Sequence, residues 1–201
     1  ALGRLEEALA PMQKAMEIAT ALGDWTNAAV GSGNLSELRL TLGDVAGAVE
    51  DAKRSVALSE QSGDELQRMS KPVILATALH QAFHESEALS LFRQAEILQA
   101  EIWPERPLLS TLRGFVYCDL LLAVSERLFW KSLLNLMDEN DVDDWRESCN
   151  AVDVRAAQTL AWAQDTQLGL LTTALDHLSY GRVALYRAAL ENRGTSNPYY
   201  S

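Results

Sequence analysis

The stretch GRLEEALAPMQKAMEI, residues 3 to 18, returns as GDVAGAVEDAKRSVAL at 43 to 58 and as FHESEALSLFRQAEIL at 83 to 98. The small residues keep the register, because Ala8, Ala48 and Ala88 stand 40 residues apart. A period of this length is typical of stacked helix pairs. The sequence therefore predicts an all-α repeat protein.

Each copy of the repeat reads as an amphipathic helix. Further helices are predicted between the copies at 25–42 and 66–83. Gly43 ends the first of these, and Asp64 with Gln67 three residues later forms a plausible capping box at the start of the second. In the first copy, apolar and small residues recur every three or four positions, which places them on one helix face: Leu5, Ala8, Leu9, Met12, Ala15, Met16 and Ala19. Residues 1–100 are thus expected to form regular helix pairs.

The regular spacing ends near residue 100. Pro104 and Pro107 interrupt helix formation, so residues 101–107 are expected to be a linker and a new helix to begin near Leu108. A second apolar segment at 126–137 is interpreted as an inserted helix.

The rest of the chain continues this irregular pattern. The acidic stretch DENDVDD at 138–144 predicts a solvated loop, and Asp144 with Glu147 would cap a helix that starts at Trp145. Residues 108–190 are expected to be irregular helical repeats, and 191–201 a frayed tail. The whole chain, 1–201, is expected to be a single domain.

Composition narrows the classes of partner. The chain has 201 residues, is 48% hydrophobic and carries a net charge of −11, which repels nucleic-acid phosphates and anionic membrane surfaces. Two cysteines are too few for a disulfide framework, and there is neither a membrane-length apolar run nor a signal-peptide pattern. A cytoplasmic protein that binds no nucleic acid and no membrane is expected. The start in mid-motif at Ala1 indicates a piece of a longer protein.

Residues 34 to 58, NLSELRLTLGDVAGAVEDAKRSVAL, resemble the tetratricopeptide repeat. The matching large, small and turn positions are Leu35, Ser36, Gly43, Ala48 and Ser55. Two positions depart from the pattern: Arg39 replaces an aromatic residue, and Ala52 replaces a larger one. The resemblance covers residues 3–100 and implies a right-handed superhelical solenoid of antiparallel helix pairs.

A second resemblance lies beyond residue 100. PLLSTLRGFVYCDLLL, RAAQTLAWAQ and ALDHLSYGRVALY are similar to the helical repeat region of large bacterial signal-transduction ATPases of the STAND class. This resemblance implies a sensor or scaffold arm of a larger bacterial signalling protein, attached to an effector that this chain lacks.

Motifs that carry chemistry are scarce, and no enzyme activity, cofactor or metal site is expected. The chain has no GxxxxGK[ST] phosphate loop, and GSGN at 31–34 is interpreted as a close-packing segment within a helix. His80 and His84 have the spacing of a metal pair on one helix face but no third ligand nearby. Cys118 lies on an apolar stripe and is interpreted as a small core residue.

Function is expected to lie in the surface of the helical stack, where the first helix of each pair lines a groove. The candidate groove residues are Asn34, Glu37, Thr41, Thr77, His80, Gln81, Arg113, Tyr117, Asp119 and Tyr180. Glu37 and Asp119 favour a protein or peptide partner with basic segments. The alternative is a structural oligomerisation module that forms a homodimer through the ends of the stack.

Overall fold

A computed structural model describes residues 4–137, 144–166 and 169–194, and all regular structure in these residues is helical. The prediction of an all-α protein is confirmed. The chain divides into two compact units, Ala1–Pro107 and Leu108–Ser201. None of the described helices is long and apolar enough to cross a membrane. The helices are α1 (Leu5–Ala21), α2 (Trp25–Thr41), α3 (Val45–Ser62), α4 (Glu65–Gln81), α5 (Glu85–Ile102), α6 (Thr111–Leu133), α7 (Asp144–Thr166) and α8 (Leu170–Gly194).

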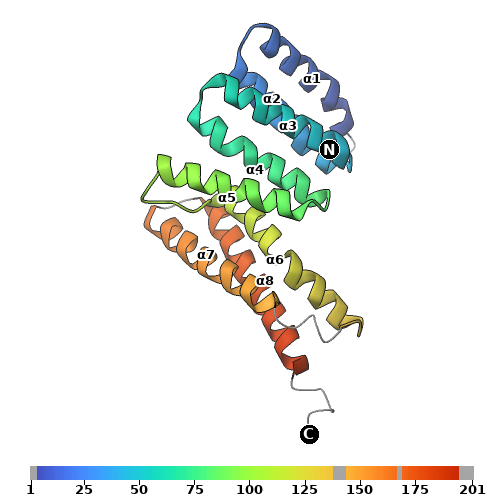
Figure 1. The fold of residues 1–201 in the computed structure, drawn as a ribbon, viewed down its shortest axis with the longest axis vertical. Coiled ribbons are helices and arrows are strands. Elements are labelled where there is room, and N and C mark those ends of the chain that lie inside the picture. Colours follow the sequence, from blue (N-terminus) through green and yellow to red (C-terminus); the bar gives the residue numbers. More distant parts are fainter. Residues whose placement is uncertain (1–3, 138–143, 167–168, 195–201) are drawn as a thin grey trace. The chain divides into compact units, whose positions relative to one another are not determined.

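The first unit is a stack of consecutive helices, α1 to α5 (Figure 1). Each helix packs against the next, and α2 also contacts α4. The helices keep the predicted period, since α1, α3 and α5 begin at residues 5, 45 and 85, while α2 and α4 begin at 25 and 65.

The turns of the first unit recur twice as often as the predicted repeat. Gly23, Gly43 and Gly63 follow α1, α2 and α3 with φ values of 71°, 83° and 66°. Phe83 takes the same place after α4 with φ 62°. Glycine suits this left-handed conformation because it has no Cβ to clash with the backbone. The structural unit is therefore one helix and one turn in 20 residues.

An aspartate follows each of the three turn glycines and caps the next helix. The side chains of Asp24, Asp44 and Asp64 each accept a hydrogen bond from the backbone N–H three residues later, at 2.9–3.1 Å. The predicted cap at Asp64 is confirmed. His84 stands in the equivalent place before α5 without a side-chain cap bond.

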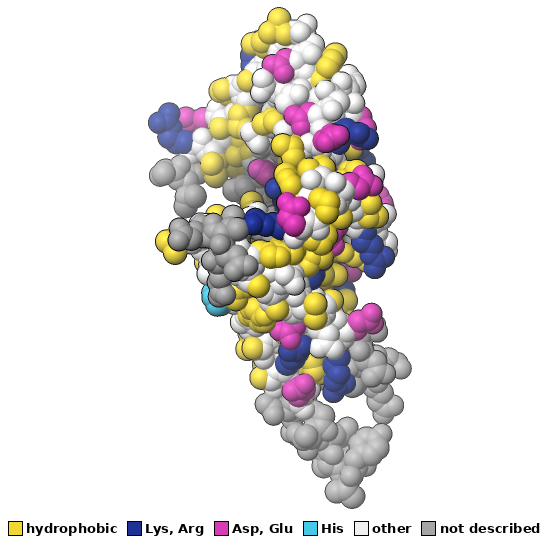
Figure 2. Space-filling view, turned by 90° about the vertical axis from the view of Figure 1, so that its left-hand side faces the viewer, with side chains coloured by type: hydrophobic (Ala, Val, Ile, Leu, Met, Phe, Trp, Pro, Cys, Tyr) yellow, Lys and Arg dark blue, Asp and Glu magenta, His cyan; other side chains and the backbone are white. Residues whose placement is uncertain are grey.

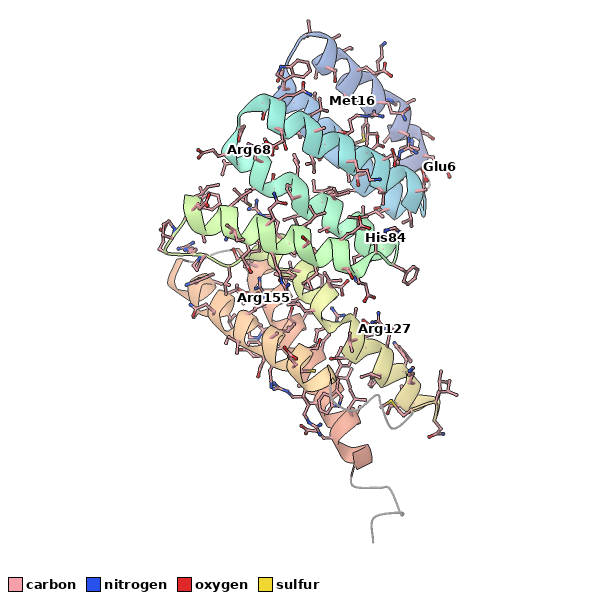
Figure 3. All side chains as sticks on the ribbon, in the orientation of Figure 1. Glu6, Met16, Arg68, His84, Arg127 and Arg155 are labelled. Carbon is pink, nitrogen blue, oxygen red and sulfur yellow. The ribbon has the colours of Figure 1, made fainter. Side chains whose placement is uncertain are left out.

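Close packing in the first unit centres on α2. A Cβ atom added to Gly31 would lie 3.2 Å from the Met16 Cβ atom of α1 (Figure 3), and one added to Gly33 would lie 2.9 Å from the Ile74 Cδ1 atom of α4. The interpretation of GSGN as a packing segment is confirmed, because larger residues would push the neighbouring helices away.

The second unit consists of α6, α7 and α8, each of which packs against the other two. Its core is formed by buried side chains from all three helices: Cys118, Leu122, Leu128, Trp145, Cys149, Val152, Val183, Tyr186 and Leu190. The interpretation of Cys118 as a core residue is confirmed.

The prediction of an inserted helix at 126–137 is wrong. A single helix, α6, runs unbroken from Thr111 to Leu133, and it starts three residues later than predicted. The polar residues that suggested a break are satisfied by tertiary contacts, since Ser125 donates to the Trp145 carbonyl oxygen at 3.2 Å and Glu126 pairs with Arg182 at 3.0 Å. The predicted linker is shorter in helix-free length at its start, because α5 extends to Ile102. Most of the predicted loop at 138–144 and of the tail at 191–201 lies outside the described residues.

Candidate functional site

Three of the candidate groove residues lie on α2. Asn34, Glu37 and Thr41 are all exposed, and their spacing of three and four residues places them along one side of the helix. The Thr41 hydroxyl donates back to the Glu37 carbonyl oxygen at 2.9 Å, so it is already partly engaged.

Three more candidates lie on α4, which contacts α2 directly. Thr77 and His80 are half-buried and Gln81 is exposed. The contact between the helices passes through Ile74 of α4 and Gly33 of α2. We call the surface formed by the six candidates on these two helices the α2–α4 face.

A buried lysine lies at the base of this face, and the sequence analysis did not identify it. Lys71 is 6% exposed, and its Nζ atom lies 3.5 Å from the place that a Cβ of Gly33 would occupy. The absence of a side chain at Gly33 therefore leaves room for the ammonium group. Helical periodicity carried the signal, because Lys71 stands four residues before the buried Leu75 and seven before the buried Ala78.

Glu37 is an exposed carboxylate that nonetheless loses part of its hydration. Burial by surrounding protein raises the pKa of Glu37, and the positive charge of Lys71 opposes that rise. A side chain that is open to solvent yet surrounded by protein atoms is expected on a concave surface. Such a carboxylate attracts a cation more strongly than one on a convex surface, because water screens it less.

The candidates in the second unit are largely engaged within the unit itself. Tyr117 is 5% exposed, and the Arg155 guanidinium carbon lies 4.4 Å from the centre of its ring. Asp119 pairs with Arg182 of α8 at 2.7 Å. These contacts stabilise the packing of the three helices and leave the two side chains poorly placed to receive a partner.

Arg113 and Tyr180 are half-buried residues of α6 and α8. Burial lowers the pKa of Arg113, and burial followed by the charges of Asp153 and Asp176 raises the pKa of Tyr180. The structure thus divides the ten candidates into the α2–α4 face of one unit and a set of α6 and α8 residues in the other.

A buried polar cluster within the second unit was also missed by sequence reasoning. Asp176 of α8 is 8% exposed, and its Oδ1 atom accepts a 2.9 Å hydrogen bond from Thr159 of α7, while Oδ2 has no partner. Burial raises the pKa of Asp176. Burial also raises the pKa of the nearby Cys118 thiol, although the Arg155 guanidinium opposes this. A thiol with a raised pKa is a poor nucleophile.

The predicted geometry of the histidine pair is wrong. His80 lies near the end of α4, whereas His84 lies beyond the turn and precedes α5, so the two do not share a helix face. Within the part of the chain that the structure describes, no group of three or more His, Cys, Asp or Glu side chains could hold a metal ion.

A small surface pocket lies elsewhere in the first unit, between the start of α4 and the end of α5. It is lined by Glu65, Arg68, Leu98, Glu101 and Ile102. None of the predicted groove residues borders it, and Arg68 also pairs with Glu60 at 3.0 Å. Scans against protein-family models, curated proteins and solved structures give no significant match to this chain.

Proposed function

We propose that the chain is a non-catalytic binding protein and that the α2–α4 face receives a peptide or protein segment carrying Lys or Arg. The observation that carries the proposal is the position of Glu37, an exposed carboxylate with a raised pKa on a helix that contacts α4. A cationic side chain placed there would restore the interactions that Glu37 loses with water.

The resemblance to the tetratricopeptide repeat supports this proposal, because solenoids of helix pairs present a concave surface to protein ligands. We further propose that the first unit is a right-handed solenoid of this class. The resemblance to STAND-class ATPases suggests that it serves as the sensor or scaffold arm of a larger bacterial signalling protein.

The test is a peptide-array screen followed by association kinetics on the selected peptides. We expect peptides rich in Lys and Arg, with association slower at about 0.5 M than at about 0.05 M salt because the Debye length shortens. Glu37→Gln should weaken binding and Glu37→Lys should weaken it further.

Glu50→Lys is the matched control. Glu50 is exposed on α3, away from the α2–α4 face, and its reversal changes the net charge by the same amount. If Glu50→Lys weakens binding as much as Glu37→Lys, the total charge attracts the peptide and the proposed face is wrong. Selection of acidic peptides would also contradict the proposal.

A further inference from the structure

The outer face of α8 carries an apolar repeat that the core of the second unit does not use. Leu171, Leu178 and Leu185 are 68%, 51% and 53% exposed and stand seven residues apart. Exposed small residues occupy the intervening positions with the same spacing: Ala174, Gly181 and Ala188. We call these six residues the α8 seam. Single exposed leucines are common on protein surfaces, but a heptad repeat of exposed leucines is typical of a helix that packs against another helix.

Gly181 gives separate support for a partner helix. The four glycines within α2, α3 and α6 each lie where an added Cβ would meet an atom of this chain within 3.2 Å. An added Cβ at Gly181 would meet nothing within 4 Å. Glycine is less stable than alanine inside a helix, so a contact usually accounts for its presence. No contact within the described chain accounts for Gly181, whereas close approach by a second helix would.

We propose that the occupant is a second copy of this chain, with the two α8 helices packed antiparallel around a twofold axis. The seam is self-complementary in this orientation. When Leu178 faces the partner's Gly181, Leu171 faces the partner's Ala188 and Leu185 faces the partner's Ala174. Every leucine then meets a small residue, as the packing of knobs into holes requires. A parallel pair would instead oppose leucine to leucine and small residue to small residue.

The size of the seam sets the strength of the dimer. Residues 171 to 188 span roughly 27 Å of helix, so the contact is smaller than the standard interface of about 800 Å² per partner. We expect a dissociation constant on the order of 10 to 100 μM. Each copy carries a net charge of −11, so the copies repel one another and added salt should strengthen the dimer. Salt should weaken the proposed peptide binding, which separates the two activities.

Sedimentation equilibrium between about 5 and 500 μM tests the association. The weight-average mass should rise from 22.1 kDa toward twice that value. Ala174→Glu should raise the dissociation constant at least about tenfold, because it places a charge in the seam without a partner. Ala46→Glu is the matched control, since Ala46 is an exposed helical alanine of the first unit, and it should leave the constant unchanged. A monomer throughout the range, or equal effects of the two substitutions, would overturn the proposal.

Disulfide trapping tests the orientation. A mixture of Leu171→Cys and Ala188→Cys chains should form mixed disulfides, whereas either variant alone should not, because the antiparallel pair separates its cysteines by roughly 26 Å. The native Cys118 and Cys149 are buried and should not react in the folded protein. Efficient trapping of either variant alone would contradict the antiparallel register.

Discussion

The Ser55 hydroxyl of α3 donates a 2.7 Å hydrogen bond to the Ala29 carbonyl oxygen of α2, and both residues are fully buried. A second bond runs the other way, from the Ser32 hydroxyl of α2 to the Asp51 carbonyl oxygen of α3 at 2.8 Å. The two bonds tie the helices together at a contact where small side chains let the backbones approach closely.

The Ser55 bond should contribute measurably to stability. Ser55→Ala should lower the free energy of unfolding by about 0.5 to 1.5 kcal/mol, because the buried hydrogen bond is lost. Ser90→Ala, at an exposed position of α5, should cost nothing. Urea unfolding of both variants measures the difference, and equal midpoints would mean that the Ser55 bond is not formed.

The repeated alanines should not tolerate larger side chains. Ala48 and Ala88 have no exposed surface, so Ala48→Leu and Ala88→Leu should each lower the free energy of unfolding by about 1 to 3 kcal/mol through overpacking. Ala46→Leu is the control at an exposed position of α3. Unchanged urea midpoints at unchanged slope for the two buried sites would contradict the close packing described above.

Phe83 is strained, because it occupies a left-handed turn position where the three earlier turns have glycine. Its side chain is 87% exposed and contributes little packing. Phe83→Gly should therefore raise the free energy of unfolding by about 0.5 to 1 kcal/mol, after allowing for the greater freedom of glycine in the unfolded chain. Thermal unfolding measures the gain. Phe83→Ala keeps the Cβ and should give none, so an equal gain from both variants would exclude backbone strain as the cause.

Asp176 should make stability depend on pH. Its folded-state pKa is raised above the unfolded value, so the folded protein binds the proton more tightly. The stabilising contribution is complete below the unfolded pKa of about 4 and is lost as pH rises through the folded pKa. The pKa shift arises mainly from burial, with the Thr159 hydrogen bond and the charge of His177 opposing it.

Asp176→Asn removes this titration and is the comparison to make. The stability of the unsubstituted protein relative to Asp176→Asn should fall as pH rises above about 4 and then become constant. Urea unfolding at a series of pH values measures the difference between the two proteins. A difference that grows in the opposite direction would mean that Asp176 is stabilised as the anion.

The groove candidates show how far sequence reasoning reached. On α2, the spacing of Asn34, Glu37 and Thr41 was enough to place them together on an exposed side. On α6, the same reasoning selected Tyr117 and Asp119, which contact Arg155 and Arg182 instead. Spacing along one helix cannot identify an arginine that arrives from another helix 38 or 63 residues later in the chain.

The sequence by itself determined the helices and the turns of the first unit. Apolar spacing, the turn glycines and the capping aspartates act within a few residues of one another, so their effects are readable without the fold. The Gly-Asp pairs at 23–24, 43–44 and 63–64 contained the 20-residue spacing of the turns, although the 40-residue similarity concealed it.

Only the tertiary structure decided the length of α6, the burial of Lys71 beside Gly33 and the isolation of the Asp176 carboxylate. Each depends on contacts between helices. Ser125 and Glu126 look like a break in α6 until Trp145 and Arg182 supply their hydrogen-bond partners. A polar side chain is compatible with either a chain break or a helix interior, and the partner that satisfies it decides between them.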